Sequence, residues 1–197
     1  CHADFSGAVL AGCKLRRARL DPALLFGADL TAADLRDTSL RRADLRGACL
    51  RNADLTGSDL FEADLREGVL AAADPKFGFR RIEAGGKARV GDAQGAKLVG
   101  ANLERSKLSG VIAVKADFTD AILKDARLVR ANRKQATMKG CNLSGADLSG
   151  ADLDGADLRD AVLVGAKTLS WNVQNANMAG ALTDKPAGIA ATSMPYK

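Results

Sequence analysis

From Phe5 to Leu70, every fifth residue of this chain is leucine or phenylalanine, and this spacing constrains the fold more than any other feature. The residue two positions earlier is always small: alanine in ten of the fourteen cases, and cysteine, threonine, serine or glycine once each. On an α-helix, five residues turn through about 140°, so these leucines would circle the helix without forming a stripe. On a flat strand, an odd spacing would place successive leucines on opposite faces. The pattern therefore predicts a solenoid whose backbone turns a corner once every five residues.

The repeated unit resembles that of a known family. Ala28-Asp29-Leu30, Ala33-Asp34-Leu35 and Ala43-Asp44-Leu45 are similar to the A(D/N)LXX signature of pentapeptide-repeat proteins, and residues 146–159 read ADLSGADLDGADLR. The resemblance covers residues 3 to about 180, with one gap. It implies an all-β fold, a right-handed quadrilateral β-helix with four pentapeptides per coil. In that fold, the leucine and the small residue of each repeat both point inward.

Four sides of five residues make a coil of twenty, so residues twenty apart should stack in columns, such as Leu10, Leu30, Leu50 and Leu70. Two inward side chains on every side compete for a narrow interior, which explains why one of them must be small. Glycine recurs two residues after the leucine, where we expect the corner to require a backbone conformation that a Cβ disfavours.

The repeat is interrupted once. After Leu70, the next inward position holds Pro75, and clean repeats resume only at Leu98, three residues out of register. We therefore divide one continuous solenoid domain into four parts: a first block of coils over residues 1–74, an insert over 75–95, a second block over 96–183, and a cap or tail over 184–197.

The insert is too long for the coil interior and should project as a β-hairpin or a flexible loop, because Phe77 and Phe79 alternate and Gly85-Gly86 can form a turn. Aromatic and basic side chains in a projecting segment make a plausible anchor for a protein partner. The candidate partner-binding residues are Phe77, Phe79, Arg80, Arg81, Lys87 and Arg89. A tolerated surface insertion without a binding role is the alternative.

Two further positions depart from the repeat. Arg133 occupies an inward leucine position, where an unpaired charge would be costly. Ala113, one coil earlier in the same column, could leave space for it, but a local bulge that turns Arg133 outward is the favoured interpretation. Trp171 occupies a small-residue position, so we expect the regular solenoid to deform or end near it.

The formal charge of +5 is uneven: residues 1–75 carry −2, residues 76–140 carry +9 and residues 141–197 carry −2. A basic middle can attract acidic proteins, nucleic acid or anionic membranes. The scarcity of aromatic residues outside the insert disfavours nucleic acid. No apolar run is long enough to form a transmembrane helix.

Catalytic chemistry is not indicated. The one histidine is His2, and the chain has no nucleophile elbow, phosphate loop or metal-binding motif. The aspartates recur at a fixed position of the repeat, which indicates a structural role. We therefore expect no catalytic, cofactor-binding or metal-binding residues and no enzymatic activity.

The sequence favours a non-enzymatic scaffold that presents a rigid rod and a basic, aromatic loop to a protein partner. The absence of a visible signal peptide suggests a cytoplasmic location. The resemblance implies an alternative, since some pentapeptide-repeat proteins, including quinolone-resistance proteins, bind DNA gyrase or topoisomerase IV as mimics of duplex DNA. The basic middle of this chain disfavours that role. A spacer domain of a longer polypeptide is a further alternative. The open edge of the first coil would need cover from upstream residues, charged side chains or a second copy in a homodimer.

Overall fold

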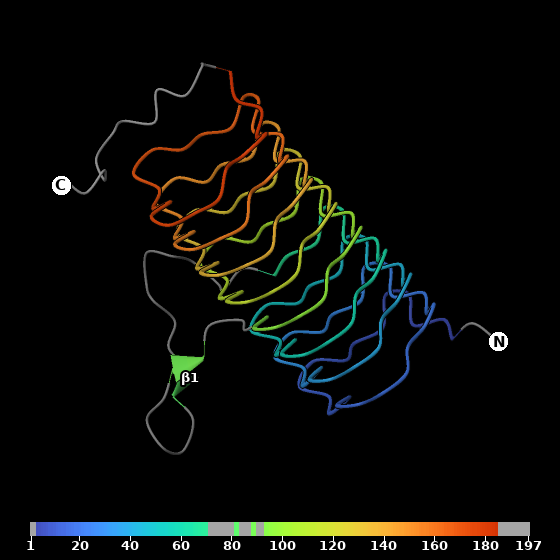
Figure 1. Cartoon of the computed structure of the whole chain (residues 1–197). Coiled ribbons are helices and arrows are strands. Elements are labelled where there is room, and N and C mark those ends of the chain that lie inside the picture. The colour runs from blue at the N-terminus through green and yellow to red at the C-terminus, as the bar shows by residue number, and fades with distance from the viewer. Residues whose placement is uncertain (1–2, 71–80, 83–87, 90–92, 185–197) are drawn as a thin grey trace, which may run out of the picture.

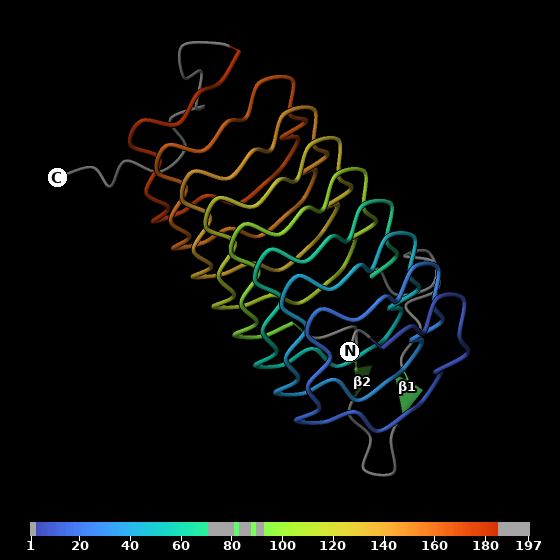
Figure 2. The ribbon, with the colours of Figure 1, turned by 90° about the vertical axis from the view of Figure 1, so that its right-hand side faces the viewer.

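The computed structural model describes residues 3–70, 81–82, 88–89 and 93–184, and for the two short middle segments only the backbone. The described residues form a rod of stacked coils with the N- and C-terminal coils at opposite ends (Figures 1 and 2). Parallel bridges join residues twenty positions apart, as in Asp4 with Leu24 and Val9 with Asp29. This spacing confirms the predicted twenty-residue coil.

Each side of a coil is too short to form a regular strand, because a corner follows every five residues. The sides are joined by single bridges, in which, for example, the Leu10 N–H donates to the Asp29 carbonyl at 2.7 Å and the Asp29 N–H to the Ala8 carbonyl at 2.9 Å. The only strands of the described chain are β1 (Arg81–Ile82) and β2 (Ala88–Arg89). No helix in that part of the chain is long and apolar enough to cross a membrane.

Apart from the corner at Pro22, where proline keeps φ negative, the described corners are type II turns. At the first, the Ala8 N–H donates to the Phe5 carbonyl at 3.0 Å, and Gly7 has a φ of 66°. A type II turn requires a positive φ at its third residue, which favours glycine. Sixteen residues other than glycine also adopt φ values of 53–61° at corners, among them Ala32. Tertiary packing therefore maintains a conformation that costs such residues roughly 1–2 kcal/mol.

Where a described repeat has aspartate or asparagine before its central residue, that residue caps the corner that follows. Its side-chain oxygen accepts a hydrogen bond from the backbone N–H two residues later, as in Asp157 with Arg159 at 3.1 Å and Asn142 with Ser144 at 3.0 Å. This Asx turn satisfies an N–H that the bridges between coils do not use. It gives a structural reason for the Asp or Asn of the A(D/N)LXX signature.

The core is a stack of inward side chains, two from every side. Most leucines at the central position and the small residues two before them are at most 4% exposed. We number the sides by the column of central residues that each contains. Side 1 contains Phe5, Leu25, Leu45, Leu65, Leu103, Leu123, Leu143 and Leu163; side 2 contains Leu10, Leu30, Leu50, Leu70, Leu108, Leu128, Leu148 and Thr168. Side 3 contains Leu15, Leu35, Leu55, Ala93, Ala113, Arg133, Leu153 and Val173; side 4 contains Leu20, Leu40, Leu60, Leu98, Phe118, Met138, Leu158 and Met178.

The two blocks of coils form one continuous stack. Across the interruption, Asp59 bridges Lys97, a separation of 38 residues in place of 20, so eighteen residues are additional to the coil. The chain leaves the coil after Leu70 on side 2 and is back in it at Ala93 on side 3. Between these points, β1 pairs antiparallel with β2, and Figure 1 shows β1 outside the coils.

Arg133 is not turned outward, so the prediction of a local bulge was wrong. Its side chain is 0% exposed, and its backbone keeps the regular pattern, since the Arg133 N–H donates to the Asp152 carbonyl at 2.7 Å. Ala113 lies directly before it in the side 3 column and is also fully buried. The small alanine leaves room inside the coil for the long arginine side chain.

The coil also neither breaks nor ends at Trp171, contrary to expectation. Bridges continue from Asp152 to Asn172, from Asp157 to Asn177 and from Val162 to Leu182. Trp171 lies in the last described coil, where the inward side chains are only half-buried and pack against the core from one end. A large ring is accepted there because the interior is less confined than within the stack.

Candidate protein-binding face

One side of the rod is distinctly basic. The outward positions of side 2 hold five basic residues and two acidic ones among the described residues, whereas those of the other three sides together hold sixteen basic and nineteen acidic. The basic residues are Arg51, Lys107, Arg127, Arg130 and Lys167, which we call the side 2 cluster. All five are exposed, and none forms an ion pair with a carboxylate in the described part of the chain.

Part of the side 2 cluster is electrostatically unfavourable for the fold. Lys107 and Arg127 lie directly opposite each other on adjacent coils, and like charges in such pairs are destabilising. Arg130 follows at the corner of the same side. Asp147, the next residue in the column, is the acidic neighbour, and its pKa is lowered by its hydrogen bond to Ser149 and further by Lys167 and Arg127. An acidic ligand would relieve the repulsion among the remaining cations.

Many cations on the other sides are already engaged. Arg36, Arg46, Arg66 and Arg159 each fold back onto the Asp two residues earlier in a bidentate contact. In the Arg159 pair, Nε and Nη2 lie 2.9 and 2.6 Å from the two carboxylate oxygens of Asp157. Such pairs neutralise both partners, so they leave little net charge for an external ligand.

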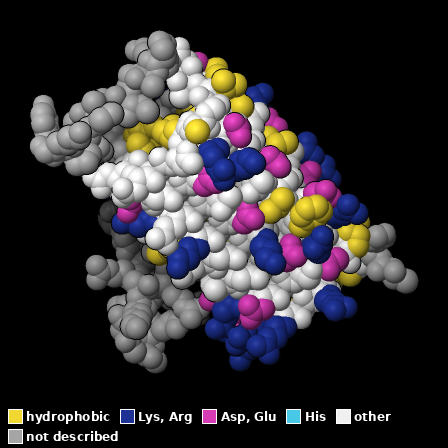
Figure 3. Space-filling model, viewed as in Figure 1, with side chains coloured by type: hydrophobic (Ala, Val, Ile, Leu, Met, Phe, Trp, Pro, Cys, Tyr) yellow, Lys and Arg dark blue, Asp and Glu magenta, His cyan; other side chains and the backbone are white. Residues whose placement is uncertain are grey.

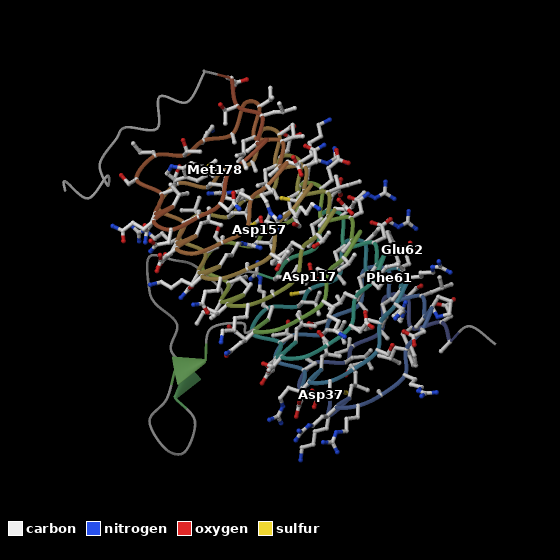
Figure 4. All side chains as sticks on the ribbon, in the orientation of Figure 1. Asp37, Phe61, Glu62, Asp117, Asp157 and Met178 are labelled. Carbon is white, nitrogen blue, oxygen red and sulfur yellow. The ribbon has the colours of Figure 1, made fainter. Side chains whose placement is uncertain are left out.

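Near the N-terminal end, sides 3 and 4 carry further paired charges. Arg42 donates to Glu62 at 2.7 Å, the Arg41 guanidinium lies 4.7 Å from the centre of the Phe61 ring, and Arg16 lies 3.4 Å from Asp37. Figure 4 labels Phe61 and Glu62 side by side at the edge of the rod. Among the described residues, ten of the sixteen outward basic residues on the other three sides form ion pairs, whereas none of the five on side 2 does.

Within the described coils, no side forms the continuous acidic surface that mimicry of duplex DNA would require. Arginine side chains neutralise the acidic columns. The Arg36 guanidinium contacts both Asp34 and Asp54. The Arg46 guanidinium contacts both Asp44 and Asp64. On the face seen in Figure 3, basic and acidic side chains are intermixed.

The described residues show no arrangement for catalysis. They contain no group of three or more His, Cys, Asp or Glu side chains that could hold a metal ion. The pKa of Asp34 is lowered to about 2 by its hydrogen bonds and ion pair with Arg36, and that of Asp29 is lowered by Thr31. Aspartates with lowered pKa values are poor general acids or bases near neutral pH.

The sequence-predicted binding residues belong largely to the undescribed segment. Phe77, Phe79, Arg80 and Lys87 lie outside the described residues. For Arg81 and Arg89, the backbone shows that they face each other across the β1–β2 pair. The segment leaves the coil from side 2, so it begins on the side that holds the side 2 cluster.

Comparison with protein families identifies a match over most of the chain. The family described as Pentapeptide repeats matches in eight copies over residues 3–42, 23–60, 38–74, 92–125 and 126–165. This chain belongs to the pentapeptide-repeat family. Solved structures of pentapeptide-repeat proteins fold as right-handed quadrilateral β-helices, in agreement with the four-sided coil described above.

Several solved structures resemble this pentapeptide-repeat protein. HetL, involved in heterocyst differentiation regulation in the cyanobacterium Nostoc sp. strain PCC 7120, is 28% identical, with 94% of this chain and 77% of HetL covered and a TM-score of 0.52. A pentapeptide-repeat protein from the Arabidopsis thaliana thylakoid lumen is 30% identical over 50% of this chain and 70% of its own, with a TM-score of 0.47. Full-length QnrB1, a plasmid-mediated fluoroquinolone resistance protein, is 20% identical over 95% and 82%, with a TM-score of 0.41. A comparison with curated proteins gave no match.

The sequence indicates the basic middle of the pentapeptide-repeat chain, but not the excess of basic over acidic residues on side 2, which includes Arg51 and Lys167 from outside that middle. The signal was present in part, because Lys107, Arg127 and Lys167 are separated by multiples of twenty residues. Their position relative to Arg51 depends on the eighteen additional residues between the blocks. These residues determine at which side the chain re-enters the coil.

Proposed function

We propose that this protein is a non-enzymatic scaffold that binds an acidic protein partner through side 2 and the adjoining segment 71–92. The observation that carries the proposal is the side 2 cluster, five exposed cations without an ion pair among the described residues. The adjoining segment adds Lys76, Arg80, Arg81, Lys87 and Arg89 and two phenylalanines. A projecting segment of this composition would supply apolar anchors beside a steering charge.

An acidic protein fits these features better than nucleic acid does. The described part of side 2 carries no aromatic side chain on which bases could stack. The alternative role as a gyrase or topoisomerase modulator would require a negative surface, which the paired acidic columns of sides 1 and 3 do not supply. The cytoplasmic location expected from the sequence stays a prediction, which fractionation of native cells would test.

The test is affinity capture from native lysate, treated with nuclease, using four forms of the chain. The first is the unaltered protein. The second lacks residues 75–92, so that Ala93 follows Asp74 directly and lies five residues after Leu70, as the repeat requires. The third carries Lys107→Glu and Arg127→Glu on side 2. The fourth, as a control with the same change in charge, carries Lys97→Glu and Lys139→Glu on side 4.

We expect the unaltered protein and the side 4 control to recover the same acidic partner. The deletion and the side 2 variant should lose it, and binding of the purified partner should weaken as salt is raised from 0.05 to about 0.5 M. Equal recovery with all four forms would place the binding surface elsewhere on the rod. Recovery that disappears with nuclease would show that the ligand is nucleic acid and would contradict the proposal.

A further inference from the structure

Arg133 places a guanidinium group inside the β-helix, in a position that the packing of the fold does not require. It is the largest fully buried side chain of the described residues, in a column where Leu35, Leu55 and Leu153 are the regular occupants. The coil backbone remains regular around it, because the Ala136 N–H donates to the Arg133 carbonyl at 3.0 Å. The charge is therefore held within an intact coil.

The guanidinium group has no acceptor in the described interior. Nε, Nη1 and Nη2 are all buried, and none donates a hydrogen bond. The physical reason is the direction of the backbone: carbonyl groups such as those of Val111 and Asp152 point along the rod axis and accept from adjacent coils. The nearest favourable contact is with the Phe118 ring, whose centre lies 4.4 Å from Cζ of Arg133. A ring face attracts a cation but accepts no ordinary hydrogen bond from its N–H groups.

The described interior also supplies no counter-charge. Burial lowers the pKa of Arg133 to about 10, which still leaves the group protonated at neutral pH. Cys141 is the neighbouring titratable group inside the coil, but burial raises the pKa of its thiol to about 12, so it is neutral under the same conditions. An unpaired buried charge is strongly destabilising and is normally compensated by a partner.

The column beneath Arg133 holds small side chains. Ala113 and Ala93 occupy two successive central positions, where the other coils of side 3 have Leu or Val in every case but Arg133. Both alanines are nearly fully buried, at 0% and 3% exposed. Two alanines in succession occupy less volume than the leucines of the other coils, and the longer Arg133 side chain takes up part of the difference.

We propose that the coil interior beside Arg133, Ala113 and Phe118 binds a small monovalent inorganic anion of the size of chloride. The guanidinium N–H groups donate to the anion, and buried apolar side chains line the remainder of the site. The ion is enclosed when the coils close around it, so binding is coupled to folding and stabilises the folded state alone. Larger anions are excluded because two inward side chains on every side confine the interior.

The test compares unfolding of the full chain in sodium chloride and in sodium gluconate at equal ionic strength, since gluconate is too large for the interior. For a single site, the unfolding constant should fall about tenfold for each tenfold rise in chloride above the dissociation constant. Arg133→Leu should abolish this difference between the two salts. Leucine is the residue that the side 3 column has one coil later, at position 153. Arg130→Leu, which removes an exposed arginine from side 2, should retain it.

A second measurement does not depend on any variant. Crystals of the unaltered protein grown in bromide should show an anomalous peak within hydrogen-bonding distance of the Arg133 guanidinium. The proposal is overturned if Arg133→Leu keeps the full chloride dependence. It is equally overturned if the bromide crystals show ordered water, or no peak, beside Arg133.

Discussion

At the scale of the residue, the repeat works because one side chain performs two functions. Asp34 accepts a hydrogen bond from the Arg36 backbone N–H at 3.3 Å, which caps the corner, and its carboxylate also contacts the Arg36 guanidinium at 2.5 and 2.7 Å. Asn102 and Asn132 perform the first function without the second. The cap therefore needs an oxygen acceptor, and the ion pair needs the charge.

This distinction predicts how acid affects Asp34. Its pKa is about 2 in the folded protein, below the ordinary value of about 3.9, so its stabilising contribution is present above pH 4 and is lost as the pH falls towards 2. Asp34→Asn should cost no more than about 1 kcal/mol at pH 7, since the cap is kept and the pair is near the surface. The variant should lose less stability than the unaltered protein between pH 4 and pH 2, measured by urea unfolding.

The control for that measurement is Asp125→Asn, which removes a carboxylate from a corner position that does not cap a turn. It should lose stability in acid as the unaltered protein does. Equal acid sensitivity of Asp34→Asn and the unaltered protein would show that the ion pair with Arg36 makes no contribution.

At the scale of the element, the coil tolerates an eighteen-residue interruption because each corner depends mainly on its own five residues and on the coils above and below. Gly57 donates to the Gln94 carbonyl at 3.1 Å, so the bridges across the interruption are as regular as those elsewhere. Loop closure becomes only slightly more costly as a loop lengthens. Such an interruption can therefore be kept for binding at little cost in stability.

Deletion of residues 75–92 should thus give a protein that folds as an uninterrupted coil. Its free energy of unfolding should lie within about 1 kcal/mol of the unaltered value, or above it, because a loop is removed and the spacing from Leu70 to Ala93 becomes five. Circular dichroism and urea unfolding would measure this. Deleting seventeen residues, 75–91, is the matched control, since it shifts the frame by one and should unfold the second block. Comparable stability of the two deletion variants would contradict the observed register of the coils on either side of the interruption.

At the scale of the whole molecule, the rod is a one-dimensional stack in which each coil contacts only its neighbours. The inward side chains Leu45 and Leu148, inside the stack, are 0% exposed, whereas Phe5 and Leu10 in the first coil and Met178 in the last are only half-buried. Figure 4 shows Met178 in the terminal coils. Burial, and with it local stability, is therefore expected to decrease towards both ends.

Hydrogen exchange should show this gradient directly. Amides of residues 25–65 and 98–163 that donate to adjacent coils should be the most protected, and those of residues 5–20 and 166–182 should exchange at least about tenfold faster, because the end coils open with less loss of packing. Mass spectrometry after proteolysis would resolve the segments. Uniform protection from end to end would indicate that the rod unfolds only as a single unit.

The coil could be predicted from the amino-acid sequence alone. The spacing of leucines, the small residues before them and the capping aspartates act within five residues or at a separation of twenty, so Leu30, Ala28 and Asp29 are sufficient to predict their own environment. The continuation of the coil beyond Trp171 was missed, because the half-buried environment of an end coil depends on its position in the stack.

Two features that bear on function depend on contacts between coils and could not be predicted from the repeat. Arg133 lies inside the coil because Ala113 and Ala93 lie beneath it, and whether a long side chain turns inward depends on the volume left by its neighbours in other coils. The side 2 cluster exists because Val69 bridges Lys107, a pairing that is set by where the chain re-enters the stack. The five-residue period specifies the contacts that repeat in every coil. The register between the two blocks specifies which charged residues share one side of the rod.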